Sequence, residues 1–248
     1  MARVSARALD VNICLCHCCQ TTPAPPNQNR PMPSTLSPNC PVCEQAELQH
    51  FQAINQQHYL RCPECQCTVM APDGHLSAEQ EKAIYQYHNN NPSDSGYRRF
   101  LSKVADPLLA RLPRGAHGLD FGCGPGPALA AMLEEAGMIM ALYDPFFHPQ
   151  LDVLQQQYDV ITCTEVLEHL HRPAAVLRQL DGLLKPGGLL AVMTCFQTDD
   201  TRFASWHYRR DPTHVVFYKE ETLALIAERY KWTLEIPRKD VAIFTKAE

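Results

Sequence analysis

Three glycines alternate with other residues in the segment 122–126, near the middle of the 248-residue chain. Apolar residues before this segment end in Asp120, and the alanine-rich run 128–136 follows it after Pro127. An apolar run that leads through glycines into a helical run is typical of a buried parallel strand that turns tightly into a helix, with bare backbone open to a ligand. Proline suits the first position of such a helix. We therefore expect an α/β domain with a doubly wound sheet.

The spacing of the glycines limits the ligand that this turn can hold. A dinucleotide-binding turn reads G-x-G-x-x-G and presents a helix N-terminus to a pyrophosphate. Here the third glycine comes one residue early, and Pro127 lacks the backbone N–H that would donate to a phosphate. The observed D-x-G-x-G-x-G pattern resembles the class I S-adenosylmethionine-dependent methyltransferases, whose cofactor carries no phosphate. On this motif alone, a glycine turn in another kind of α/β domain stays an alternative.

Three later segments resemble the same family in the same order. Residues 138–144 form a second apolar run that ends in an acid, about twenty residues after the glycines. A third run, 158–164, continues into E-V-L-E-H-L at 165–170, which resembles the family's segment beside the cofactor and the reacting centre. Residues 183–194 resemble its helix end, L-K-P-G-G turn and next strand. The resemblance covers 97–248 and implies a Rossmann-like, mostly parallel sheet of the seven-stranded type with an antiparallel C-terminal strand.

The resemblance also implies which residues contact S-adenosylmethionine. They belong to the glycine turn and to the ends of the neighbouring strands: Asp120, Gly122, Cys123, Gly124, Gly126, Asp144, Thr164 and Glu165. Asp144 occupies the place of the acid that binds ribose hydroxyls in nucleotide-binding sheets.

The segment 145–157 departs from the family pattern. The family usually has a helix, a strand and an adenine-binding loop at this place, and the segment is too short for all three. We expect this unit to be truncated or irregular. Phe146 or Phe147 is expected to pack near the adenine, with burial in the core as the alternative.

A loop rich in aromatic residues follows the strand that ends near Thr194. It carries Trp206, Tyr208, Phe217 and several charged residues, at a place where parallel sheets form their binding crevices. We interpret it as a substrate lid. The candidates for a general base are His214 and Asp211 on this loop and His169 after the third strand. Structural roles, as a lid anchor for His214 and a helix cap or core residue for His169, stay open.

Two C-x-x-C pairs precede these motifs. Cys40, Cys43, Cys62 and Cys65 have the spacing of a four-thiolate zinc ribbon, in which each pair places two sulfurs on one side of a tight turn. Such a small module needs the metal to fold. A closed four-sulfur site has no open coordination position, so the predicted Zn²⁺ is structural. Cys67 is interpreted as a bystander thiol.

These motifs divide the chain into four predicted regions. Residues 1–38 are expected to be disordered, since 21–38 is rich in Pro, Asn, Gln and Ser. The cysteines in 14–19 are interpreted as incidental, and translation is hypothesised to begin at Met32. Residues 39–76 form the zinc ribbon, 77–112 a helical linker that covers the cofactor, and 113–248 the S-adenosylmethionine-binding domain. A capping box at Ser77 begins a helix in the linker.

Composition limits the function further. A formal net charge of −5 disfavours a protein that grips nucleic-acid phosphates over a broad surface. No apolar run reaches the length of a membrane span. The C-x-x-C spacing favours metal-bound thiolates in a reducing compartment, so a cytoplasmic protein is expected.

The resemblance therefore implies an enzyme, an S-adenosylmethionine-dependent methyltransferase that acts on an O or C atom of a small-molecule or carrier-bound substrate. One alternative is an RNA base methyltransferase that recognises RNA through its zinc ribbon. Another is a non-catalytic adaptor with a vestigial methyltransferase fold, which the intact glycines, Asp120 and Asp144 disfavour. The substrate and the oligomeric state are left unassigned.

Overall fold

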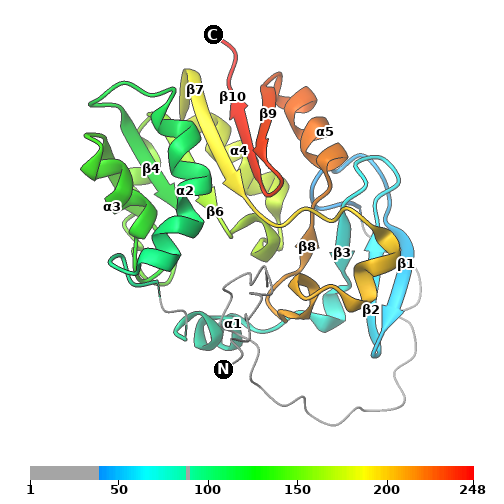
Figure 1. Ribbon diagram of the computed structural model, residues 1–248. Helices are drawn as coiled ribbons and strands as arrows, with labels where there is room; N and C mark the ends of the chain where they lie inside the picture. Colours follow the sequence, from blue (N-terminus) through cyan, green and yellow to red (C-terminus); the bar gives the residue numbers. More distant parts are fainter. Residues whose placement is uncertain (1–38, 88–89) are drawn as a thin grey trace, which may run out of the picture.

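The computed structural model describes residues 39–87 and 90–248. The predictions of disorder in 1–38, of incidental cysteines in 14–19 and of a start at Met32 all concern residues outside the described ones. In the described part the chain forms two sheets, a six-stranded sheet with helices on both faces and a four-stranded sheet beside it (Figure 1).

The large sheet has the strand order β5-β4-β6-β7-β10-β9. Strands β5, β4, β6 and β7 are parallel, and β10 runs antiparallel to both of its neighbours. The chain passes from β4 to β5 on one side and later to β6 on the other, which places a topological switch point at the carboxyl end of β4. The strands are β4 (His117–Phe121), β5 (Ile139–Tyr143), β6 (Tyr158–Thr164), β7 (Leu184–Met193), β9 (Thr233–Arg238) and β10 (Val241–Thr245).

The predicted α/β fold with an antiparallel C-terminal strand is confirmed. The sheet has six strands where the seven-stranded type has seven, because a short 3-10 helix, η2 (Leu151–Gln155), is all that lies between β5 and β6. This agrees with the expectation that the unit at 145–157 is truncated.

Helices cover the large sheet on both faces because the strands alternate their buried side chains between two apolar clusters. Helices α2 (Ser95–Leu109) and α3 (Ala128–Glu135) pack on one face, where Val160 and Ile243 contribute to the cluster. Helices α4 (Pro173–Leu183) and α5 (Glu220–Tyr230) pack on the other, where Ile161 and Phe244 contribute.

The small sheet has the order β1-β2-β3-β8 and combines distant parts of the chain. Strands β1 (Gln49–Ile54), β2 (Gln57–Arg61) and β3 (Thr68–Met70) come from the predicted zinc ribbon. Strand β8 (Val216–Phe217) comes from the aromatic loop and pairs with β3 through Val69 and Val216. The sequence did not indicate this pairing, which joins the ribbon to the loop after β7.

Helix α1 (Ala78–Tyr85) lies on the side to which the carboxyl ends of β4, β6 and β7 point (Figure 1). Ser77 caps it with the predicted capping box, and Asp94 caps α2. The remaining 3-10 helices are η1 (Pro72–Gly74), η3 (Leu167–His169), η4 (Asp200–Ser205) and η5 (Tyr208–Arg210). Among the described helices, none is both long and apolar enough to cross a bilayer.

Candidate functional site

The glycine turn follows β4 and approaches other backbone closely. Gly122 and Gly124 have positive φ angles of 77° and 65°, a conformation that side chains with a Cβ rarely adopt. A Cβ on Gly126 would lie 2.0 Å from the carbonyl oxygen of Asn90. The alternating glycines are thus required by the backbone conformation and by close packing, and the turn presents bare peptide groups at the switch point.

Asp120 is the buried acid at the end of β4. Its side chain accepts a hydrogen bond of 2.7 Å from the hydroxyl of Thr162 on β6. Burial raises the pKa of Asp120 to about 6, and the bond from Thr162 opposes this shift only in part. Burial makes the ionised form of Asp120 unfavourable when no cation is nearby. The side chain is therefore suited to receive a cationic ligand group, which would stabilise its negative charge.

Asp144 lies at the tip of β5 and connects it to the glycine turn. One carboxylate oxygen accepts from the N–H of Gly124 at 3.1 Å. The other accepts from the N–H groups of Phe146 and Phe147 at 2.8 and 3.0 Å. The carboxylate is therefore fixed in place, and the oxygen that accepts from Gly124 has a further lone pair for a ligand hydroxyl.

The other predicted cofactor residues gather at the same edge of the sheet. Cys123 is buried, which raises the pKa of its thiol. The hydroxyl of Thr164 is buried without a hydrogen-bond partner. Glu165 adopts a positive φ of 53°, an uncommon backbone conformation that often marks a functional site. Tyr97 lies close enough to Asp120 and Glu165 that both carboxylates add to the effect of burial in raising its pKa.

Phe146 packs against the ring of Tyr85 from α1, with ring centroids 5.8 Å apart. It is half-buried, as is Phe147. The expected adenine contact of either ring stays a prediction.

The three predicted catalytic residues come together although they are distant in sequence. The rings of His169 and His214 lie 4.7 Å apart, edge to face. Asp211 lies beside them, with a carboxylate oxygen 3.9 Å from Nε2 of His214. The side chain of Asp211 also accepts hydrogen bonds from Thr213, which shapes the turn that carries His214.

The two imidazoles are oriented by backbone carbonyl groups. Nδ1 of His214 lies 2.7 Å from the oxygen of Tyr208, and Nδ1 of His169 lies 3.1 Å from the oxygen of Thr213. Because a carbonyl oxygen can only accept, each Nδ1 carries a proton. In the neutral ring this leaves Nε2 with a lone pair.

Burial controls the charge of His214. It lowers the pKa of this ring to about 4, and the neighbouring His169 adds to the shift. Burial also acts to raise the pKa of Asp211, but its interactions with His214 and Thr213 outweigh that effect, and the net shift is downward. At neutral pH the pair is therefore a neutral imidazole beside a carboxylate.

Glu168 is a fourth member of this cluster, and sequence reasoning did not select it. The side chain is completely buried, and neither carboxylate oxygen has a hydrogen-bond partner. Nε2 of His169 lies 3.7 Å from one of its oxygens. The sequence placed Glu168 in the E-V-L-E-H-L segment, but only the 3-10 turn of η3 shows that the side chain points inward.

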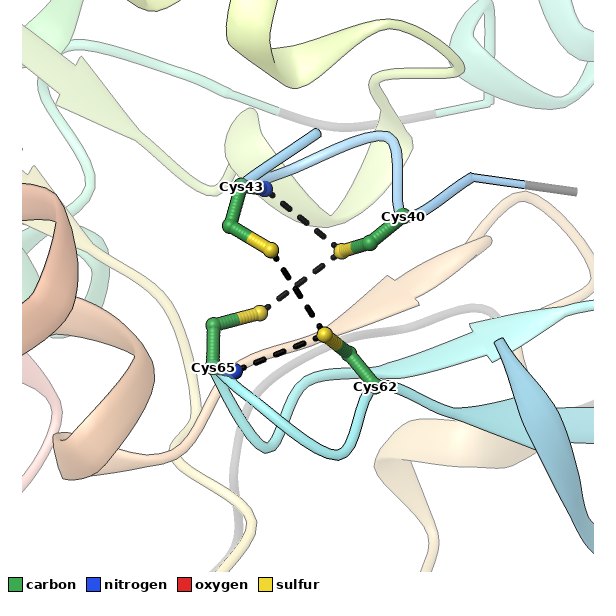
Figure 2. Close-up of side chains that lie close together, drawn as sticks. All are labelled: Cys40, Cys43, Cys62 and Cys65. Carbon is green, nitrogen blue, oxygen red and sulfur yellow. Dashed lines mark hydrogen bonds between the residues drawn. The ribbon is translucent and has the colours of Figure 1, made fainter. Parts of the chain in front are cut away.

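Four cysteines converge on one point, two from the turn at 40–43 and two from the turn between β2 and β3 (Figure 2). The Sγ atoms of Cys40 and Cys65 lie 3.6 Å apart, and those of Cys43 and Cys62 lie 3.5 Å apart. Four sulfurs at 2.3 Å from a zinc ion would be separated by about 3.8 Å, so the spacing fits a tetrahedral thiolate site.

The pKa values of the thiols at this site are shifted in opposite directions. Hydrogen bonds from Cys65 and Cys67 lower the pKa of Cys40 to about 2, and burial raises that of Cys43 to about 11. Cys67 is completely buried, with Sγ 3.5 Å from that of Cys40. The cluster of buried donors suits a soft metal such as zinc, with Cys67 as a neighbouring thiol.

The cysteine site is attached to the large sheet. On the side of the Cys40–Cys43 turn, Arg229 of α5 donates to the carbonyl of Cys43 and forms an ion pair with Glu44 at 3.0 Å. On the other side, Tyr59 packs edge-on against Phe203 and Phe217 from the loop after β7. The same loop carries His214, so the ribbon supports the loop that brings this histidine to the cluster.

Comparison with known proteins assigns residues 93–235, more than half of the chain, to a family. Residues 93–235 match the family model described as a methyltransferase domain. Similar curated proteins include the ubiquinone biosynthesis O-methyltransferase of Aeromonas salmonicida, 39% identical over 33% of this chain and 35% of that protein. The protein of the same description in Escherichia coli is 33% identical over 41% of this chain and 48% of that protein. The chain thus spans about half or less of the length of these relatives.

Among solved structures, one similar fold belongs to an O-methyltransferase family protein from Burkholderia thailandensis. It is 16% identical, with a TM-score of 0.47, and the match covers 69% of this chain and 61% of that one.

Proposed function

Since the chain belongs to the methyltransferase-domain family, we propose that it transfers a methyl group from S-adenosylmethionine to an oxygen or carbon atom of a small-molecule or carrier-bound substrate. The observation that carries this proposal is the arrangement at the switch point. There, a glycine turn with bare backbone lies between two fixed acids, Asp120 and Asp144.

Each of these elements has a role that suits this cofactor. The turn at Gly122–Gly126 admits the methionine and ribose portions against the backbone, and Asp144 accepts from ribose hydroxyls. Asp120 lies among buried groups, where a cationic ligand would relieve the cost of its charge. S-adenosylmethionine supplies an electrophilic methyl group on a positively charged sulfur.

The residues of the chain mainly hold the nucleophile in line with the methyl group. Such positioning can contribute on the order of 7–11 kcal/mol. We assign the nucleophile's place to the region beside His169 and His214, because their Nε2 lone pairs can accept its proton. Asp211 holds the turn of His214 and acts as a positioning residue. Groups that accept a proton favour a hydroxyl nucleophile, and the two curated relatives are named as O-methyltransferases.

The four cysteines would hold a structural Zn²⁺ that supports the loop after β7. Thiolates at such a site are stable in a reducing compartment, which supports the cytoplasm as the location. The proposal that the ribbon recognises RNA is disfavoured by the net charge of −5. A non-catalytic adaptor is disfavoured because the strained Glu165 and the unpartnered Glu168 lower stability without an evident structural benefit.

Calorimetric titration of the full chain with S-adenosylmethionine tests the proposal. One molecule is expected to bind per chain, and Asp144→Asn is expected to weaken binding by about tenfold or more, since a buried hydrogen bond to a charged group contributes about 1.5–3 kcal/mol. The matched control is Asp152→Asn, at an exposed position, with unchanged binding. Release of S-adenosylhomocysteine with hydroxyl-bearing small molecules then identifies the acceptor class.

Absence of binding to the wild-type chain would refute the proposal. Tight RNA binding that weakens steeply with salt would favour the RNA methyltransferase instead.

A further inference from the structure

We propose that Glu168, His169 and His214 bind a divalent metal ion beside the methyl-transfer site, separate from the four-cysteine site. The ion would hold the oxygen that accepts the methyl group. The existence of the metal site is argued from the geometry of these three side chains, and only its role toward the substrate rests on the proposed function.

The three side chains offer one ligand atom each, and these atoms all lie within 4.8 Å of one another. Ligand atoms at metal–ligand distances of about 2.0–2.2 Å lie roughly 3–3.6 Å apart around one ion. Small side-chain shifts would therefore bring the carboxylate oxygen and the two imidazole nitrogens onto a common ion. The three side chains come from two segments, η3 at 167–169 and the turn at 211–214, which are joined directly after the turn, where the N–H of Val215 donates to the carbonyl of Glu168 at 2.8 Å. The arrangement is therefore fixed by the fold.

The orientation of both histidines leaves lone pairs directed away from the backbone. The Nδ1 atoms of His169 and His214 donate to the carbonyl oxygens of Thr213 and Tyr208. A backbone carbonyl on the second nitrogen is the usual way in which proteins fix the tautomer of a metal-binding histidine. Both Nε2 atoms are thereby left as ligands.

The buried carboxylate of Glu168 points to a positively charged partner. Its carboxylate is completely buried, and neither oxygen has a hydrogen-bond partner. A buried carboxylate without a partner is costly, and proteins pair such groups or use them to bind metal ions. The nearest cationic candidate, His169, lies 3.7 Å away, which is too far for a hydrogen bond. A metal ion between them would bind both.

None of the other polar groups described around the cluster supplies a positive charge. Asp211 lies 3.9 Å from Nε2 of His214 and adds negative charge. The hydroxyl of Tyr208 lies 3.0 Å from Thr194 and 3.3 Å from Glu165. Burial raises the pKa of this hydroxyl, and the nearby Glu165 and Glu168 add to the shift. The nearby groups therefore increase the negative potential, which favours a cation.

Two imidazoles and one carboxylate leave open coordination positions on an octahedral ion. A substrate with two neighbouring oxygens, such as a vicinal dihydroxy compound, would fill two of them. With the ion bound, His169 and His214 would act as its ligands and not as the base. The ion would lower the pKa of a substrate hydroxyl, whose proton would leave to solvent. The oxygen would then attack the methyl group of S-adenosylmethionine, which breaks the S–CH3 bond and releases S-adenosylhomocysteine. The proposed substrate class is thus a chelating dihydroxy or hydroxy-carbonyl small molecule.

Mn²⁺ is the probe that separates the two metal sites, because it prefers nitrogen and oxygen ligands and competes poorly with zinc for thiolates. Zinc-loaded full chain is titrated with Mn²⁺, and the loss of the electron paramagnetic resonance signal of free Mn²⁺ measures binding. One Mn²⁺ is expected per chain, and it is expected to raise the melting temperature by mass action. Glu168→Gln and His214→Gln are each expected to weaken Mn²⁺ binding by more than about 100-fold.

The matched control is His207→Gln, an exposed histidine on the same loop, which is expected to bind Mn²⁺ like the wild type. A cooperative thermal unfolding transition of zinc-loaded Glu168→Gln shows that this variant is folded. If the wild type binds no Mn²⁺ beyond the zinc site, or if Glu168→Gln binds it equally well, the metal site is refuted. A chain that binds Mn²⁺ but no S-adenosylmethionine refutes the proposed function and leaves the metal site standing.

Discussion

Asp120→Asn tests whether the carboxylate at the end of β4 is held at an energetic cost. Burial raises the pKa of Asp120 from 3.8 to about 6 in the folded protein. One pKa unit corresponds to 1.36 kcal/mol, so the ionised form costs the apo fold about 3 kcal/mol at pH values above the folded pKa. Because the folded pKa is the higher one, the folded state binds more protons between the two values. Its stability therefore falls as the pH rises through this window.

The assay is urea unfolding of the zinc-loaded wild type and of Asp120→Asn at several pH values. Asparagine does not titrate. Its altered hydrogen bonds change the free energy of unfolding by the same amount at every pH, so the pH dependence of the difference between the two proteins reports on the carboxylate alone. The stability of the wild type relative to the variant is expected to fall by about 1.4 kcal/mol between about pH 5 and about pH 7.5. Saturating S-adenosylmethionine is expected to reduce this fall, since its positive charges would stabilise the carboxylate.

The control is Asp159→Asn on β6. The pKa of Asp159 is lowered overall, because its bonds with Lys185 and His117 outweigh the effect of its partial burial. The sign is therefore opposite, and the contribution of Asp159 is lost only below about pH 5. Between about pH 5 and about pH 7.5, the stability of the wild type relative to this variant is expected to stay nearly constant. A relative stability of the Asp120 pair that is constant or increases with pH would show that the carboxylate is not held at a cost.

Three further predictions concern the metal site, the loop and the glycine turn. Cys43→Ser is expected to lose the bound zinc and several kcal/mol of stability, whereas Cys195→Ser keeps one zinc per chain by elemental analysis. Phe203→Ala is expected to lower the free energy of unfolding by about 3–5 kcal/mol, since the ring is 1% exposed between Tyr59 and Phe217; a loss below about 1 kcal/mol would contradict this packing. Gly126→Ala is expected to weaken S-adenosylmethionine binding, because its Cβ would meet a backbone oxygen at 2.0 Å, whereas Gly182→Ala, with open space in α4, is expected to raise the melting temperature.

Local patterns in the sequence were sufficient for much of the fold. The glycine turn after Asp120 identified the β4–α3 unit, because positive φ angles and close contact between two backbone segments both need glycine. Ser77 and its capping partner marked the start of α1, and the C-x-x-C pairs predicted four converging sulfurs. In each case, residues close in sequence determine the structure.

Contacts between distant segments were not predictable in the same way. Strand β8 has two residues and no periodicity of its own, so nothing in the sequence indicated that Val216 pairs with Val69. His169 and His214 were selected separately as candidates, and only the fold shows that they face each other. Glu168 was passed over because an acid in this segment gives no sign of burial until the 3-10 turn directs it inward.

The central claim is that the backbone at 122–126 and the acids beside it hold S-adenosylmethionine. A crystal structure of the full chain with S-adenosylhomocysteine tests it most directly. We expect the ligand against the glycine turn, its ribose hydroxyls on Asp144 and its sulfur facing the cluster of His169 and His214. A crevice filled by protein side chains, or a ligand bound elsewhere, would contradict the account.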